Sequence, residues 1–150
     1  MIRFLPIVVL ATALLGASAA RAEGVITRAS AHGADETLTR LVAAIEAKGL
    51  AVIATIDHAA GAAKAGLVLP PTTLVVFGDP KVGTPLIEAS PTAGLDLPLK
   101  ALVYQAADGT VAVAANDPAY LAARHGITGQ DERIARMAAA IDALLTAATE

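Results

Sequence analysis

A short buried strand followed by repeated Gly and Pro breaks is the feature of this sequence that most constrains its fold. The run 73–77 (TLVVF) is apolar and β-branched and ends at Gly78, a pattern typical of a strand buried on both faces. Asp79-Pro80 then predicts the start of a helix, because Asp caps free backbone N–H groups and Pro lacks the N–H that would have no partner there. The chain must therefore turn directly after this strand.

Two further breaks divide the stretch that follows. Gly83 predicts an early end to the first helical turn, and Thr84-Pro85 repeats the combination of a cap and a proline, so a second short helix is expected to start there. Pro91 stops that helix. The run 94–98 (GLDLP) is predicted to be extended or turn-like, because a residue before proline avoids the helical region.

Periodicity predicts the other elements of the chain. Apolar β-branched runs or alternation predict strands at 24–30, 50–56, 99–105 and 110–114, and Asp108-Gly109 predicts a hairpin between the last two. Apolar residues at helical spacing predict helices at 34–48, at 59–66, from Asn116-Asp117-Pro118 to about 124, and from about Thr128 to the end. This order predicts an α+β fold with two layers: a mixed, mostly antiparallel sheet of about five strands with helices packed mainly on one face.

The first 22 residues have the pattern of a secretory signal peptide. Arg3 gives a positive start, residues 4–15 are apolar, and Ala20-Arg21-Ala22 forms a small-x-small cleavage site. The alternative, an uncleaved anchor, is disfavoured because the apolar run is short for a bilayer. We expect cleavage after Ala22, a single mature domain at 23–150 that is periplasmic or secreted, and no membrane attachment after cleavage.

Composition narrows the partners and the kind of core. The chain has no Cys and no Trp, so no disulfide or thiolate chemistry is available and the core must be aliphatic. Its 14 acidic residues exceed its 11 basic ones, which argues against nucleic acid or an anionic membrane surface as a partner. On the last predicted helix, Arg133, Arg136 and Glu132 are interpreted as a solvated charged face.

Several polar residues stand where predicted elements end. Sheet ends are where ligand sites collect, so we expect these side chains to share a cleft for a small ligand. Capping of helices and formation of turns are the alternative roles for the Asp and Asn residues. The candidate ligand-binding residues are Asp57, His58, Asp96, Asn116, Asp117, Arg124 and His125.

Two kinds of chemistry could use these residues. His58, His125 and Asp57 offer the nitrogen and oxygen ligands of a thiolate-free divalent metal site, for zinc or copper, although their spacing is not that of a metal motif. A His-Asp pair could instead act as a general base in a small hydrolase or isomerase. Ser30 and Ser90, the only serines after residue 22, lack the sequence context of a nucleophile.

Five blocks of the sequence together resemble the DUF302 family, and the resemblance covers about residues 24–147. It implies a compact α+β domain that forms homodimers, and it transfers no catalytic residue. The resulting prediction is an exported, non-enzymatic binding or interaction module of unknown ligand, with the metal-binding and hydrolase or isomerase readings as alternatives. The blocks are 57–62 (DHAAGA), 77–80 (FGDP) with 83–86 (GTPL), 94–99 (GLDLPL), 116–118 (NDP) and 124–126 (RHG).

Overall fold

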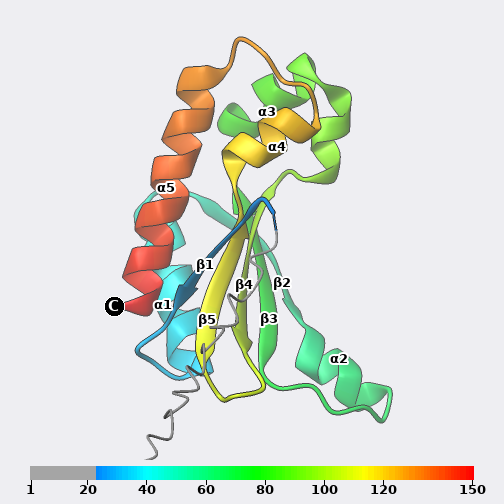
Figure 1. Ribbon diagram of the computed structural model, residues 1–150, viewed down its shortest axis with the longest axis vertical. Coiled ribbons are helices and arrows are strands. Elements are labelled where there is room, and N and C mark those ends of the chain that lie inside the picture. The colour runs from blue at the N-terminus through cyan, green and yellow to red at the C-terminus, as the bar shows by residue number, and fades with distance from the viewer. Residues whose placement is uncertain (1–22) are drawn as a thin grey trace, which may run out of the picture.

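The computed structural model describes residues 23–150, so the predicted signal peptide at 1–22 lies outside the described residues. None of the helices within 23–150 combines the length and the apolar composition that a bilayer crossing requires. Figure 1 shows the elements, which follow one another as β1 (Val25–Ala29), α1 (Ala34–Ala47), β2 (Ala51–Asp57), α2 (His58–Lys64), β3 (Thr72–Gly78), α3 (Pro80–Ala89), the 3₁₀ helix η1 (Pro91–Leu95), β4 (Leu99–Gln105), β5 (Val111–Asn116), α4 (Pro118–Arg124) and α5 (Asp131–Thr149).

The five strands form one sheet in the order β1-β5-β4-β3-β2. All four pairings within the described residues are antiparallel. The predicted two-layer α+β fold is confirmed, and the sheet is antiparallel throughout instead of mixed. The crossover through α1 joins β1 and β2, which run in the same direction but lie at opposite edges, so they cannot pair with each other.

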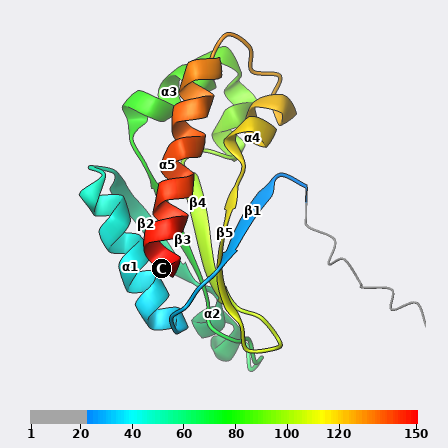
Figure 2. The ribbon, with the colours of Figure 1, turned by 60° about the vertical axis from the view of Figure 1, so that its left-hand side comes forward.

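The core lies between the sheet and two helices on the same face, α1 and α5 (Figure 2). The guanidinium of Arg28 on β1 donates hydrogen bonds to the side chains of Asp142 and Thr146, and these bonds connect α5 to the edge strand of the sheet. The core is aliphatic apart from Phe77, as the composition predicts. Its buried large side chains are Leu41 and Ile45 of α1, Ile141, Leu144 and Leu145 of α5, and Val75, Phe77, Val103, Val111 and Val113 of the sheet.

The predicted hairpin between β4 and β5 is confirmed. Gly109 has a φ of 87°, which L-residues with a side chain rarely adopt. The carboxylate of Asp108 accepts the backbone N–H of Thr110 at 2.9 Å. The backbone and side-chain hydrogen bonds from Thr110 favour the charged carboxylate and lower the pKa of Asp108. The turn thus has its own local stabilising contacts.

The predicted second helix start at Thr84 is wrong, because α3 continues through Gly83 and Pro85. Pro85 removes the N–H that would bond to the carbonyl of Lys81, four residues earlier. That carbonyl instead accepts a hydrogen bond from Nη1 of Arg133 on α5, at 3.4 Å. A partner distant in sequence therefore compensates for the proline and lets the helix run on.

Other predicted bounds also differ: β5, predicted at 110–114, extends to Asn116. The last helix begins at Asp131 and not near Thr128, because Gly129 takes a φ of 70° and ends any helical run before it. Part of the run 94–98, predicted to be extended or turn-like, belongs to η1, where the N–H of Ala93 bonds to the carbonyl of Ser90 at 2.9 Å.

The caps give a direct test of these helix starts. Asp117 accepts the N–H of Ala119 at 2.8 Å and begins α4, so Asp117→Ala should lower the free energy of unfolding by about 1 kcal/mol. Thr84 lies inside α3, so Thr84→Ala should change it by less than about 0.5 kcal/mol. Urea unfolding of residues 23–150 measures both. Equal losses in the two variants would contradict a continuous α3.

Candidate functional site

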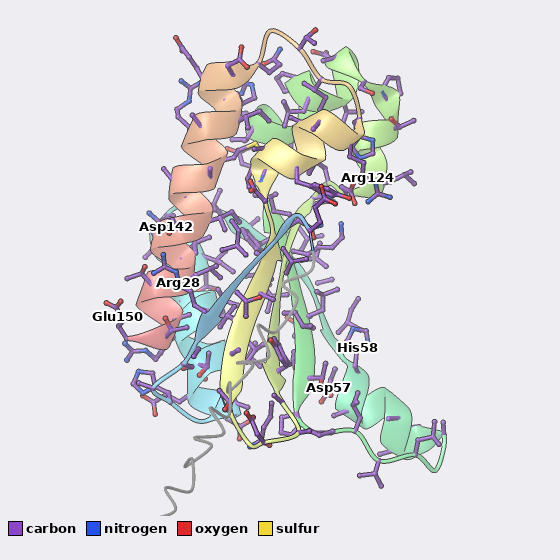
Figure 3. The ribbon with its side chains drawn as sticks, in the orientation of Figure 1. Arg28, Asp57, His58, Arg124, Asp142 and Glu150 are labelled. Carbon is purple, nitrogen blue, oxygen red and sulfur yellow. The ribbon has the colours of Figure 1, made fainter. Side chains whose placement is uncertain are left out.

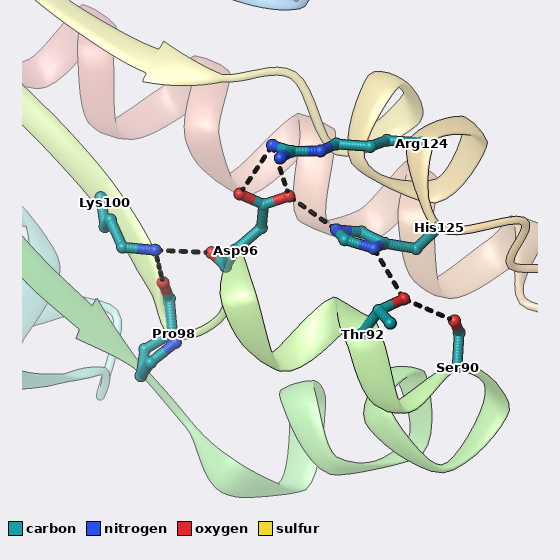
Figure 4. Close-up of polar contacts among 7 residues, drawn as sticks. All are labelled: Ser90, Thr92, Asp96, Pro98, Lys100, Arg124 and His125. Atoms are coloured by element: carbon teal, nitrogen blue, oxygen red, sulfur yellow. Dashed lines mark hydrogen bonds and ion pairs between the residues drawn. The ribbon is translucent and has the colours of Figure 1, made fainter.

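Asp96 is the centre of a polar cluster at the end of the sheet where β4 begins and β5 ends (Figure 4). Its Oδ2 lies 2.6 Å from Nε2 of His125. The guanidinium Nη1 of Arg124 lies 3.1 Å and 3.2 Å from its two carboxylate oxygens. Asp96 follows η1, and the two basic residues end α4, so the cluster ties these two short helices together.

The imidazole of His125 has a hydrogen-bond partner on each nitrogen. Its Nδ1 lies 3.0 Å from the hydroxyl of Thr92, which lies 3.2 Å from the hydroxyl of Ser90. The ionised carboxylate of Asp96 can only accept, so in the neutral ring Nε2–H donates to it and Nδ1 accepts from Thr92. The side chains of His125 and Asp96 are only 4% and 13% exposed, whereas that of Arg124 is 52% exposed. The His-Asp contact is therefore well shielded from water.

Lys100 adds a third basic group beside Asp96. Its ammonium donates to the backbone carbonyls of Asp96, at 2.9 Å, and Pro98, at 3.2 Å. The sequence interpretation missed Lys100, Thr92 and Ser90 as members of this cluster. One signal was available for Lys100, since it is the one charged residue within the apolar run 99–105.

The structure brings only some of the predicted site residues together. Asp96, Arg124 and His125 are in contact, and Asn116 and Asp117 lie at the same end of the sheet. Asp117 acts as the cap of α4, which is the alternative role given to it above. Five of the seven candidate residues thus lie at one end of the sheet, and a ligand cleft shared by them stays a prediction.

Asp57 and His58 lie at the opposite end of the sheet, far from Arg124 (Figure 3). Asp57 is the last residue of β2 and pairs with Thr73. Because β2 runs antiparallel to β5, the C-terminal ends of these two strands lie at opposite ends of the sheet. The side chain of Asp57 accepts the N–H of Ala60 at 2.8 Å and caps α2. The prediction that Asp57 and His58 share a cleft with the other residues is wrong.

The predicted metal site is wrong for the same reason. Its members, Asp57, His58 and His125, come from opposite ends of the sheet and cannot bind one ion. Across residues 23–150, no group of three or more His, Cys, Asp or Glu side chains is placed to hold a metal.

A cavity of about 400 Å³ lies between α3, the first half of α5 and the adjoining ends of β2, β3 and β4. The segment that leads from Asp96 into β4 forms part of its wall, so the polar cluster and the cavity share this segment. Two arginines of α5, Arg133 and Arg136, border the cavity. The side chain of Arg136 is 67% exposed, as expected for a solvated face, and the sequence interpretation missed only the place of the two arginines beside the cavity. The apolar side chains that line it include Leu50, Ile53, Val82, Ile87, Leu97 and Met137.

The two arginines at the cavity have different partners. Arg136 pairs with Glu132 on the same helix, at 3.4 Å. Arg133 donates from Nε to the amide oxygen of Gln130 at 3.1 Å, and from Nη1 to the carbonyl of Lys81. Arg133 is therefore held by neutral acceptors, and its position depends on the carbonyl that Pro85 releases.

A five-stranded antiparallel sheet with long helices on one face, and a helical segment between β3 and β4 that borders an open cavity, define a small α+β domain. The chain belongs to the DUF302 family, whose model, described as a domain of unknown function, matches residues 26–144. The crystal structure of an uncharacterized conserved DUF302 protein from Bacillus stearothermophilus has the same fold, with a TM-score of 0.76 at 22% identity. That match covers 85% of this chain and 99% of the other.

Curated relatives match over a shorter segment. Proteins named fluoride-specific ion channel FluC 1, from Brucella suis biovar 1 and Brucella abortus biovar 1, are each 45% identical to this chain over 104 residues. The match covers 69% of this chain but only 41% and 38% of those two proteins. The chain thus spans about two fifths of the length of the curated relatives it matches.

A double-mutant cycle tests the central contact of the polar cluster. Asp96→Ala and His125→Ala should each destabilise the domain, and together they should show a coupling energy of about 1–3 kcal/mol, because each removes the partner of a shielded polar group. Urea unfolding of the four proteins gives this coupling. The control is the pair Asp57→Ala and His125→Ala, from opposite ends of the sheet, which should be additive within about 0.5 kcal/mol. Additivity of the Asp96 and His125 variants would show that the contact does not form.

Proposed function

We propose that this chain is an exported, non-enzymatic binding module that takes a small, largely apolar molecule into the cavity between α3 and α5. The observation that carries the proposal is the cavity itself. Its volume of about 400 Å³ falls within the range of about 300–1,000 Å³ that is usual for small-molecule sites. Its lining is mostly aliphatic with a few polar groups at the border, which is the usual chemistry of such sites.

The polar cluster supports this function by positioning the cavity wall. Its shielded groups, Asp96 and His125, already satisfy each other and the hydroxyl of Thr92. These contacts hold η1 against α4, and η1 leads into Leu97, which lines the cavity. We therefore assign the cluster a structural role next to the binding site.

A small hydrolase or isomerase is the second candidate function. It is favoured by the series Thr92, His125 and Asp96, which places a hydroxyl beside an imidazole and the imidazole beside a carboxylate, the order found in nucleophilic sites. The cavity, however, is lined by other residues, and neither Thr92 nor His125 borders it. We favour binding over catalysis because the cavity, where a small molecule would fit, is separate from the series Thr92, His125 and Asp96.

The Brucella relatives are named as whole ion channels, and the present chain matches about two fifths of their length. The proposed binding function is independent of that name.

Filling the cavity tests the proposal. The fluorescent probe is N-phenyl-1-naphthylamine, a neutral apolar dye, and the protein is the chain 23–150. Ala140 borders the cavity, so Ala140→Leu should weaken dye binding at least about tenfold by occupying its volume. The control Ala139→Leu, at an exposed position on the same helix, should leave binding unchanged.

Two results would contradict the binding proposal. One is the absence of saturable dye binding by the folded wild-type protein. The other is equal dye binding by the Ala140→Leu and Ala139→Leu variants with unchanged melting temperatures.

The exported location and the homodimer are further parts of the proposal. The signal pattern at 1–22 supports export. Edge strand β2 and the loop after α2 support self-association, because they expose apolar side chains: Ile56 is 45% exposed and Val68 is 99% exposed. Such a combination of an open strand edge and exposed apolar surface is typical of an interface, and a second copy of this chain is its proposed occupant.

Native mass spectrometry of the full-length chain, expressed with its own leader in a Gram-negative host and recovered from the periplasm, tests both statements. We expect a dimer of chains that begin at Glu23. The variant Ile56→Glu with Val68→Glu should be monomeric, because it places charges on the apolar edge. A wild-type monomer would contradict the dimer, and a chain that retains residues 1–22 would contradict cleavage.

A further inference from the structure

We infer that the ligand of this cavity is an amphipathic anion, with an alkyl chain in the cavity and a carboxylate-like head group on Arg133. This inference rests on the proposed binding function and names the chemistry of the ligand.

The charge of Arg133 is not neutralised by the protein. Its two acceptors, the side-chain amide of Gln130 and the carbonyl of Lys81, carry no net charge. Among the arginines of residues 23–150, it alone has no carboxylate within ion-pair distance. The others are paired with acidic side chains: Arg28 with Asp142, Arg40 with Glu36, Arg124 with Asp96, and Arg136 with Glu132.

The guanidinium of Arg133 is also held in place before any ligand binds. The carbonyl of Lys81 is available to it because Pro85 has no N–H to offer. Gln130 fixes the Nε side of the group at 3.1 Å. A guanidinium that is already oriented loses less conformational freedom when it binds a ligand, and its planar fork suits a carboxylate.

The surroundings of Arg133 select an anion over a neutral or cationic molecule. Arg133 and Arg136 both border the cavity, and the one acidic residue there, Asp79, already caps α3 by accepting the N–H of Lys81 at 2.9 Å. The rest of the lining is largely apolar and suits an alkyl chain. A neutral alkyl ligand would leave the charge of Arg133 unmatched, and a cationic one would face two arginines.

Displacement of N-phenyl-1-naphthylamine from the chain 23–150 tests this inference. The competitors are decanoate, 1-decanol and decyltrimethylammonium, which differ mainly in the charge of the head group and are used below their micelle concentrations. We expect decanoate to displace the dye at a concentration at least about tenfold lower than 1-decanol, because a charged hydrogen-bonded pair adds to the apolar contact. Decyltrimethylammonium should be the weakest competitor.

Variants then assign the selectivity to Arg133. Arg133→Gln should weaken decanoate binding by about ten- to a hundredfold and weaken 1-decanol binding far less, because the alcohol has no charge to pair with the guanidinium. Arg133→Lys keeps the positive charge and should lose less. The matched control Lys64→Gln, at the end of α2, removes one positive charge at the far end of the sheet and should leave both affinities unchanged.

The outcomes separate this inference from the function on which it rests. If decanoate and 1-decanol compete equally and Arg133→Gln changes neither, the anionic ligand is overturned and the apolar binding site stands. If decyltrimethylammonium competes best, the anionic ligand is overturned too. If the folded protein binds neither the dye nor any of the three amphiphiles, the proposed function fails together with the inference.

Discussion

The apolar stripe of α5 packs against one face of the sheet, and the rest of the structure depends on this contact. Ile141, Leu144 and Leu145 are almost completely buried there, in one core with Val113 of β5 and with Val75 and Phe77 of β3. Each such side chain contributes about 1.5–3 kcal/mol through removal of apolar surface from water. With no Cys in the sequence, no disulfide can take over this role. The sheet is therefore stabilised by noncovalent contacts, chiefly this apolar packing.

The same helix also builds the cavity. Its C-terminal half covers the sheet, whereas its N-terminal half extends past the sheet and brings Met137, Arg133 and Arg136 to face α3. The position of these three residues is set by how the later turns of α5 pack on β5 and β1. The proposed binding site is thus fixed by the main core, although its lining belongs to another part of the molecule.

Features that depend on neighbours in sequence were predictable, and features that depend on strand order were not. The Asp117 cap and the Asp108-Gly109 hairpin involve residues that lie two to four positions apart, so the sequence contains all of their partners. Asp57 and His125 lie at opposite ends of the sheet because β2 and β5 run in opposite directions. These directions follow only from the complete pairing of the sheet, which the sequence does not reveal. Consequently the cluster around Asp96 was found in part, while Asp57 and His58 were wrongly included in it. The continuity of α3 could not be predicted either, because the group that compensates for Pro85 is Arg133, on another helix.

The domain has two cores, and this division separates the stability of the sheet from that of the cavity wall. A smaller core beneath α3 and η1, formed by Leu86, Ala93, Leu97, Leu121 and Met137, lies apart from the larger one under α1 and α5. Loosening this smaller core exposes fewer apolar side chains than melting the whole domain, so it costs less free energy. Local opening of the segment between β3 and β4 therefore costs less free energy than global unfolding, so the wall of the cavity can adjust to a ligand while the sheet keeps its shape.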